Sequence, residues 1–496
     1  MTIDAERTRP SVDGGALRGR LQDRLPARCV VWEEAVRRRF RCDALYADRS
    51  GPLVVIRPGG VDELREAVVA LAEQQVAMVP VGAGLSYSAA TLPDQPWAAM
   101  DMSSMARVRR CDARQRHVRV EAGCTWAALR EALAPQGLRT PFWGPASGLH
   151  ATIGGAVGSN AVFFGSGLHG SMADCVLGLT VMLADGTLLH TGIHAAEGPL
   201  ASPLGPDFTR SFVGACGAFG IVVDASLRLI TSPPLRRFEG FECASLDAAV
   251  EALSLLGAQG KISEALVLSP PQDTAAPRDG DRARHSLSLC LEADAPEALE
   301  AARHQVLACC REAGARHTGR GELEAFHDRP FQVPDMLRSV TGVRWIPVHA
   351  IVGFEQVGAL VAAVQSLLQS ERPRLGRLDL SWHYSCILVG GTRVLVEFSL
   401  CWPDSGNALL AHYLGAAHDG DGMSPAAQTI VALRERIVRT MAGFRATHLQ
   451  IGRLYDCVQR LDPAAQRLLR AVKEELDPDN LFNPGVLTTP QSRRNR

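Results

Sequence analysis

The strongest chemical signal in this sequence is a glycine-containing loop at residues 80–87, which follows an apolar run. Glycine lacks a Cβ atom, so a loop of this kind lets backbone N–H groups approach an anion closely. We therefore predict an anion-binding loop. Its candidate binding residues are Pro80, Gly82, Ala83, Gly84, Leu85 and Ser86.

Two common nucleotide motifs do not fit this loop. The G-x-G-x-x-G pattern fails because Tyr87 stands at the last glycine position and no acidic residue follows on a second strand about twenty residues later. A Walker A lysine is also missing, which disfavours a nucleoside triphosphatase. Taken alone, the loop is equally compatible with a simple tight turn.

Two further glycine-rich segments lie roughly sixty to seventy residues apart along the chain, at 153–160 and 214–222. Small residues at this density let a flat ligand lie against the backbone, although they also suit a loop that packs on a helix. Three such segments together predict a long ligand threaded through one domain. The candidate contacts here are Ile153, Gly154, Gly155, Gly158, Asn160, Gly217, Gly220, Ile221 and Val222.

The elements that must position these segments follow from periodicity. A strand at 53–56, a helix at 61–74 and a strand at 76–81 predict that this domain begins with a strand–helix–strand unit of the α/β type. An Asp-Gly turn predicts a hairpin over 176–191, because aspartate and glycine tolerate the positive φ angles of a two-residue turn. Residues 141–170 are expected to be loop. The remaining expected elements are a helix near 32–41, a strand at 117–121, a helix at 126–133, and a helix, turn and strand over 208–229.

Domain boundaries are expected at composition changes. The pair Pro233–Pro234 marks one boundary, and the character of the chain changes again after Met441. We predict an N-terminal arm at 1–50, a ligand-binding domain at 51–232, an inserted domain at 233–440 and a C-terminal segment at 441–496. Two polar stretches, 269–285 and 415–426, are expected to be mobile loops.

Bulk composition excludes several classes of protein. The 496 residues carry 52 Lys+Arg and 53 Asp+Glu, a balance that argues against a nucleic-acid partner. The sequence contains no run of eighteen apolar residues, so no membrane span is predicted. The N-terminus also lacks the basic and then apolar residues of a secretory signal, so we expect a cytoplasmic protein. The 13 cysteines include no C-x-x-C pair, which predicts reduced thiols and neither disulfides nor a metal site.

Together these segments resemble the vanillyl-alcohol-oxidase/p-cresol-methylhydroxylase (PCMH-type) family of flavoproteins. The resemblance covers about 52–232 and 440–496, and includes Val120–Gly123 and the closing residues 476–485 with Asn483. It implies an α+β fold with a two-part FAD-binding domain built from both chain ends and an inserted α+β cap domain. It also implies that the three glycine segments bind FAD and that Asn483 belongs to the same site.

The resemblance implies an FAD-dependent oxidoreductase acting on CH–OH or CH groups. Its flavin N5 would accept a hydride from an activated C–H bond of an aromatic alcohol or phenol-like small molecule. Oxygen or a redox protein would be the electron acceptor, and a homodimer is reasonable. Two alternatives stay open: a 2-hydroxy-acid dehydrogenase of the lactate or glycolate type, and a non-redox or catalytically altered flavin-binding protein.

Candidate catalytic residues come from the same resemblance. Tyr87 matches a loop tyrosine of the para-substituted-phenol oxidases, and Arg445 and His448 match their Tyr-Arg-Thr-His segment. Phe444 replaces the second tyrosine there, and Ala151 and Thr152 stand where those enzymes place an acid. We expect non-covalent FAD, because Leu85 occupies the position of a flavin-linking histidine in some relatives.

His383 is the last catalytic candidate. It lies with Trp382 and Tyr384 on an expected cap strand, of which one alternate face would look onto the flavin. His383 and Glu397 also resemble, as a pair, the metal ligands of related 2-hydroxy-acid dehydrogenases, and residues 418–422 superficially resemble the metal-binding segment of that group. A solvated loop is the favoured interpretation of 418–422, so no metal is assigned.

Overall fold

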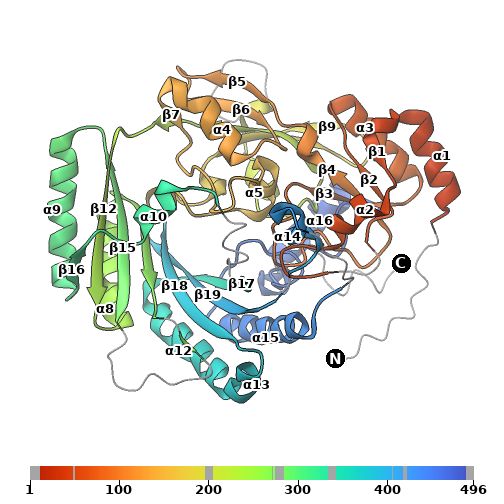
Figure 1. The fold of residues 1–496 in the computed structure, drawn as a ribbon. Coiled ribbons are helices and arrows are strands. Elements are labelled where there is room, and N and C mark those ends of the chain that lie inside the picture. The colour runs from red at the N-terminus through yellow and green to blue at the C-terminus, as the bar shows by residue number, and fades with distance from the viewer. Residues whose placement is uncertain are drawn as a thin grey trace.

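The computed structural model describes residues 12–47, 51–195, 205–270, 284–332, 342–404, 406–416 and 422–487, and the backbone of 272–273. Most of the two stretches expected to be mobile loops, including residues 418–421, lies outside these ranges. Two groups of elements make up the fold. In Figure 1, the red and orange N-terminal elements lie at the top and right, and a large green-to-blue sheet lies at the lower left.

The N-terminal group begins with a four-stranded sheet in the order β1-β2-β4-β3. Strands β2, β4 and β3 are parallel, as the predicted strand–helix–strand unit requires, and β1 pairs antiparallel with β2. The expected helix near 32–41 is a single α-turn followed by a 3₁₀ turn. The bounds are α1 Gly14–Arg24, β1 Val30–Val31, α2 Glu34–Arg37, β2 Val54–Ile56, α3 Val61–Glu73, β3 Ala77–Val81 and β4 Trp97–Asp101.

An antiparallel sheet in the order β5-β6-β10-β8-β9 completes this region. Its hairpin, β8 paired with β9, turns through Asp185 and Gly186, and Gly186 has a φ of 82°. The predicted hairpin and the predicted helix at 126–133 are therefore confirmed. The bounds are β5 Val108–Asp112, β6 His117–Glu121, α4 Trp126–Leu133, β7 Leu138–Arg139, β8 Val176–Met182, β9 Leu188–His190, α7 Thr209–Phe212, β10 Ile221–Arg228 and β11 Ile230–Thr231.

The expectation that 141–170 is loop throughout is wrong, because this segment contains two short helices, α5 Ile153–Ser159 and α6 Ser166–His169. Thr152 caps α5, since its Oγ1 accepts a hydrogen bond from the Gly155 N–H at 3.1 Å. Glycine is a poor helix former, but a Cβ on Gly154 would crowd Ala122. Close packing, which propensity does not record, explains the glycines of this helix.

The second group is built on an antiparallel sheet in the order β16-β12-β15-β13-β18-β19-β17, with β14 paired to β18. The apolar residues of one face form the largest buried cluster with α8, α12 and α15. The bounds are β12 Leu235–Cys243, α8 Leu246–Ala258, β13 Ile262–Leu268, β14 Gln272–Asp273, β15 His285–Ala293, α9 Pro296–Glu312, β16 Arg316–Gly319, α10 Leu323–Asp328, β17 Val343–Val352, α12 Phe354–Ser370, α13 Arg372–Gly376, β18 Ser381–Val389, β19 Arg393–Pro403, α14 Ala408–Leu414, α15 Pro425–Ala442 and α16 Pro463–Leu476.

The opposite face of this sheet packs on the N-terminal group. Ile351, Ile387 and Leu395 alternate with the helix-facing residues of their strands and form a cluster against which Phe163 packs. Residues near Tyr87 and Glu397 lie where the two groups meet, as described below. This sheet lies within 233–440, the range predicted to be the cap domain, and is called the cap sheet below; it contributes one wall of the space between the groups.

The C-terminal segment returns to the N-terminal group, where Leu469, Val472 and Leu476 of α16 pack against a buried apolar cluster. Met78 of β3 donates its N–H to the Leu481 carbonyl at 2.7 Å and accepts from the Asn483 N–H at 2.9 Å. The buried Lys473 ammonium reaches the carbonyl of Ala218 at 2.6 Å and pairs with Asp477. These contacts support the proposal that both chain ends build one domain.

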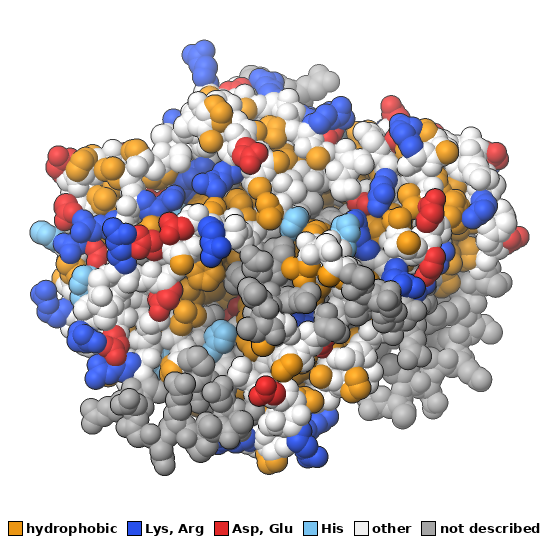
Figure 2. All heavy atoms as spheres, viewed as in Figure 1, with side chains coloured by type: hydrophobic (Ala, Val, Ile, Leu, Met, Phe, Trp, Pro, Cys, Tyr) orange, Lys and Arg blue, Asp and Glu red, His pale blue; other side chains and the backbone are white. Residues whose placement is uncertain are grey.

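The face of the molecule in Figure 2 carries charged side chains of both signs. None of the helices in these ranges is long and apolar enough to cross a bilayer. In Figure 2, Lys and Arg side chains are interspersed with Asp and Glu, most densely on the left where α9 and β16 lie. This mixture agrees with the balanced charge of the sequence.

Candidate functional site

The three glycine-containing segments converge on one cavity. It is lined mainly by small side chains and backbone, so that an extended, flat ligand can lie close to the main chain. The predicted contacts that line it are Pro80, Gly82, Ala83, Gly84, Leu85, Ser86, Gly154, Gly155, Gly158, Gly217, Gly220 and Val222.

Direct contacts between the segments hold this arrangement together. A Cβ atom on Gly82 would overlap the Thr152 hydroxyl, and one on Gly217, whose φ is 75°, would overlap the Pro80 ring. The Cys216 N–H donates to the Gly158 carbonyl at 2.9 Å. Glycine is therefore required at 82 and 217 because the segments approach one another at backbone distance.

The first loop presents unused hydrogen-bond donors. Within the described part of the chain, none of the backbone N–H groups of residues 82–86 donates to another residue. Consecutive free N–H groups form an anion-binding concavity, and buried N–H groups left unpaired are costly. This loop therefore suits a ligand with phosphate oxygens, such as the pyrophosphate of FAD.

Four predicted contacts do not line the cavity. Ile153 and Ile221 are fully buried and support the walls from behind. Asn160 ends α5 with a φ of 51°, and its side chain accepts from the Ala173 N–H at 3.0 Å. Asn483 donates to the carbonyls of Ala90 at 2.8 Å and Cys216 at 2.6 Å. Asn483 thus joins two cavity-lining segments, and we propose a supporting role for it.

Helix α14 of the cap region covers the first loop. The Tyr413 hydroxyl donates to the Ala83 carbonyl at 2.5 Å, and the Leu409 side chain lies 3.4 Å from the position of a Cβ on Gly84. A bound phosphate would therefore lie under a lid formed by a distant part of the sequence.

Tyr87 lies at the far end of the loop, at the edge of the cap sheet. Gln450, which also lines the cavity, donates from Nε2 to the Tyr87 hydroxyl at 3.2 Å. Burial, and then the neighbouring carboxylate of Glu397, raise the pKa of this hydroxyl well above its ordinary value. The hydroxyl therefore stays protonated and, having accepted from Gln450, keeps its own proton to donate.

Arg445, by contrast, is not brought to Tyr87. It is exposed, has a φ of 52° just after α15, and is absent from the cavity lining. The arginine beside Tyr87 is the fully buried Arg434, whose guanidinium lies 5.7 Å from the ring centroid and donates to the Tyr87 carbonyl at 2.6 Å. The prediction for Arg445 is corrected accordingly: the turn after α15 points this side chain to solvent.

His448 belongs to a structural cluster. Its Nδ1 lies 2.9 Å from the His349 carbonyl, and its ring stacks on Tyr455 at 4.2 Å between centroids. Burial lowers the pKa of His448 to about 4 and that of His349 to about 3. Both imidazoles are therefore neutral near pH 7. We assign His448 to positioning, through His349, whose ring meets the Tyr87 ring edge-on at 6.4 Å.

His383 and Glu397 lie on the sheet face that looks toward the N-terminal group. Glu397 of β19 is in register with Ser385 of β18 and His349 of β17, so these three side chains share that face. Burial alone raises the pKa of Glu397 to about 7, and burial lowers the pKa of His383. Among the described residues, no group of three or more potential metal ligands includes His383 or Glu397.

Sequence reasoning missed three residues of this region as catalytic or positioning groups: Gln450, Arg434 and Glu397. Gln450 directly follows the motif that drew attention to Arg445, and its φ of 46° could not be foreseen. Arg434 sits within a regular helix, where an arginine is expected to be exposed. Glu397 was noted only as a metal ligand, although a lone carboxylate within the apolar strand 393–403 signals a buried acid.

Comparison with known proteins identifies the ligand. Residues 52–192 match the family model described as FAD binding domain, and 457–487 match FAD linked oxidases, C-terminal domain. The chain is 30% identical over 297 residues to glycolate oxidase subunit GlcD of Bacillus subtilis, covering 58% of this chain and 62% of the relative. It is 25% identical over 478 residues to D-2-hydroxyglutarate dehydrogenase of Xanthomonas citri pv. viticola, covering 94% and 96%.

Coverage of several relatives is partial. The match to mitochondrial D-lactate dehydrogenase (cytochrome) of Arabidopsis thaliana, 32% identical over 182 residues, covers 37% of this chain and 31% of the relative. The chain thus spans less than two thirds of the length of the first curated relatives that it matches.

Solved structures share the whole fold. 4-Ethylphenol oxidase from Gulosibacter chungangensis superposes with a TM-score of 0.75 at 14% identity, covering 98% of this chain and 99% of that one. p-Cresol methylhydroxylase gives 0.74 at 16%, covering 95% and 96%. The predicted PCMH-type α+β fold and the FAD cofactor are therefore confirmed.

Proposed function

Since this chain is an FAD-binding flavoprotein with the PCMH-type fold, we propose that it is an FAD-dependent oxidoreductase that oxidises a small molecule at a carbon bearing a hydroxyl group. The observation that carries the proposal is the hydrogen bond between Tyr87 and Gln450, which lines the FAD cavity, together with the Glu397 carboxylate near the Tyr87 hydroxyl. FAD bound in the cavity would supply the hydride acceptor.

Glu397 has the properties of a general base. A base works best when its pKa lies near the working pH, and burial raises the pKa of this carboxyl to about 7. Above that pH the carboxylate can take the proton of a substrate hydroxyl. Removing this proton increases the tendency of the adjacent carbon to give up its hydride.

Tyr87 would orient the same substrate oxygen. Its hydroxyl remains protonated and accepts from Gln450, so it can donate to an oxygen that carries developing negative charge. Gln450 is held by its N–H, which donates to the Ser159 carbonyl at 2.9 Å. We also propose that FAD is non-covalent, because the described cavity lining contains no histidine.

The two candidate substrate classes need different protein groups to bind them. An aromatic alcohol or phenol-like molecule needs Tyr87 and apolar walls, whereas a 2-hydroxy acid needs a cation for its carboxylate. In the part of the chain that the structure describes, Arg434 is the arginine at Tyr87, and its guanidinium already serves the carbonyls of Tyr87 and Pro347. This favours the aromatic or neutral alcohol. The 2-hydroxy acid remains the second candidate, supported by the names of the curated relatives.

Anaerobic reduction of the bound flavin tests the proposal. Aryl alcohols, alkylphenols, and both enantiomers of lactate, glycolate and 2-hydroxyglutarate are added separately, and bleaching of the flavin absorbance is followed. Bleaching by one class identifies the substrate class. If dithionite bleaches the flavin but no member of the panel does, the redox function is wrong and a non-redox flavoprotein is favoured.

A further inference from the structure

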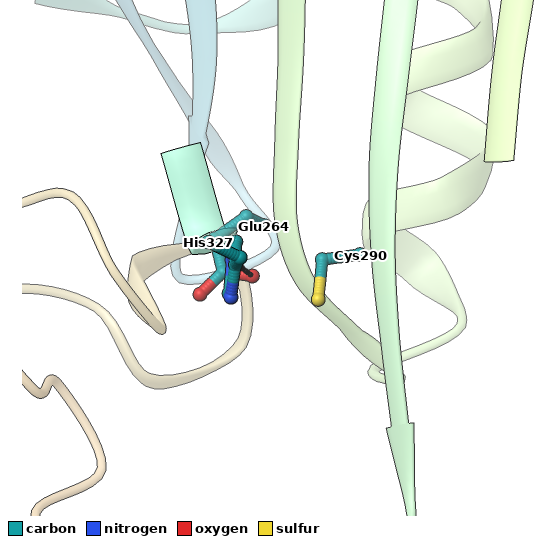
Figure 3. A group of neighbouring side chains, drawn as sticks. All are labelled: Glu264, Cys290 and His327. Carbon is teal, nitrogen blue, oxygen red and sulfur yellow. Dashed lines mark ion pairs between the residues drawn. The ribbon is translucent and has the colours of Figure 1, made fainter. Parts of the chain in front are cut away.

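Away from the FAD cavity, three buried side chains with metal-binding atoms converge between the cap sheet and the N-terminal group. Glu264 of β13 and Cys290 of β15 are in register on neighbouring strands, so both project from the same face. His327 of α10 lies against that face, and Figure 3 shows Glu264 and His327 side by side with the Cys290 thiol near them. Their potential ligand atoms all lie within 4.8 Å of one another.

Burial at this place is nearly complete. Cys290 is fully buried, Glu264 is 4% exposed, and the His327 side chain is 2% exposed. The rings of Trp143, Phe164 and Phe238 surround the imidazole, with centroids 4.9–5.4 Å away. The imidazole therefore lies among aromatic rings.

The polar atoms of the cluster are incompletely satisfied. Glu264 Oε1 accepts from the Gly165 N–H at 2.5 Å. Its other oxygen lies 3.3 Å from His327 Nε2, a contact that is an ion pair only when the imidazole is protonated. Neither of these atoms, nor His327 Nδ1, makes a well-directed hydrogen bond. A buried polar atom without a partner costs about 1–3 kcal/mol, so a ligand that binds all three residues would stabilise this place.

We propose that Glu264, Cys290 and His327 bind a zinc ion. Thiolate, imidazole and carboxylate are the three donor types that zinc takes in proteins. At typical zinc–ligand distances, the oxygen and nitrogen of a tetrahedral site lie about 3.3 Å apart, and Glu264 Oε2 lies 3.3 Å from His327 Nε2. A water molecule would complete the fourth position.

This site differs from the pair His383 and Glu397, which lies elsewhere on the sheet and belongs to the proposed substrate region. The three ligands come from separate elements, and the Gly165 N–H ties Glu264 to the N-terminal group. The zinc ion would thus join β13, β15 and α10 to one another, while Glu264 also accepts from the Gly165 N–H of the N-terminal group. Its role is structural: it fixes α10 on the cap sheet.

Zinc content of the intact flavoprotein tests the proposal. The full chain is produced with zinc in the medium, dialysed, and its zinc-to-flavin ratio is measured by plasma mass spectrometry. We expect about one zinc per chain, reduced at least tenfold in Cys290→Ser and His327→Gln. Cys243→Ser is the matched control, because Cys243 is equally buried but packs in the helix-side core. This variant should keep its zinc.

X-ray absorption at the zinc edge adds a readout that folding defects cannot imitate. Wild-type protein should show one sulfur at about 2.3 Å and nitrogen or oxygen ligands at about 2.0–2.1 Å. Glu264→Gln keeps an oxygen for the Gly165 N–H and is the conservative variant; it should bind zinc at least tenfold more weakly. Wild-type protein with less than about 0.1 zinc per chain, or zinc without a sulfur ligand, would overturn the proposal. Neither result depends on whether the protein oxidises any substrate.

Discussion

Replacing Glu397 with glutamine should remove most of the activity and also stabilise the protein at alkaline pH. Burial raises the pKa of this carboxyl from 4.5 to about 7. The folded protein therefore holds a proton that the unfolded chain has lost, and folding stability falls as the pH rises from 4.5 to 7. The stabilising contribution is complete below 4.5 and absent above 7.

The size of this effect follows from the two pKa values. Their difference corresponds to roughly 3 kcal/mol at full burial. The side chain is only partly shielded from solvent, so we expect about 2 kcal/mol. Glutamine has no proton to lose. Compared with the wild type, Glu397→Gln should therefore gain stability between pH 5 and pH 8, by about 1.5 kcal/mol over that interval.

Activity should change in the opposite direction. In the wild type, kcat/KM for the substrate found in the reduction panel should rise about tenfold per pH unit up to pH 7 and then level off. Glu397→Gln should lower the plateau by about 10²–10⁴-fold and abolish this slope. The same samples serve for both measurements across pH. Folding stability is measured by urea denaturation with saturating FAD, and activity is measured by steady-state kinetics.

Glu371→Gln is the control for both measurements. Hydrogen bonding to Arg436 lowers the pKa of Glu371, and it lies on the cap helices away from the cavity. This variant should gain no stability at alkaline pH and should retain wild-type kinetics. The reasoning about Glu397 is refuted if Glu397→Gln is less stable than the wild type at pH 8, or if it keeps the pH slope of the rate.

Three further predictions concern the walls of the site. Gly82→Ala places a methyl group against the Thr152 hydroxyl, so the dissociation constant for FAD should rise at least about tenfold, as measured by flavin fluorescence on dilution. The control is Gly60→Ala, which has open space around it and should bind FAD normally. Equal FAD affinity of the two variants would contradict the packing argument. Tyr87→Phe removes a donor to the substrate oxygen and should lower kcat/KM by about 10-fold or more without loss of FAD; an unchanged value would exclude Tyr87 from substrate binding. Asn483→Leu removes three side-chain hydrogen bonds, two of which join cavity segments, and should lower the denaturation free energy by about 3 kcal/mol. A change below about 0.5 kcal/mol, within the range of ordinary surface substitutions, would show that the backbone holds these segments unaided.

Local pattern in the sequence determined the N-terminal elements. The helix α3, the strand β3 and the β8–β9 hairpin follow from apolar spacing and from an Asp-Gly turn, which act over a few residues. The three glycine segments could likewise be recognised in the sequence, because a backbone that must approach a ligand or another backbone closely has room for few residues other than glycine. Local propensity failed at α5, where packing against Ala122 outweighs the poor helix propensity of glycine.

Tertiary structure alone decided which side chains share the site. Tyr87, Gln450 and Glu397 come from a loop, a turn after α15 and a central cap strand, and no spacing in the sequence relates them. Arg445 matched a motif but points to solvent, because one left-handed residue at the helix end sets its direction. Glu264, Cys290 and His327 meet for the same reason: strand register and helix docking are set by long-range packing, whereas sequence patterns record only the periodicity of each element.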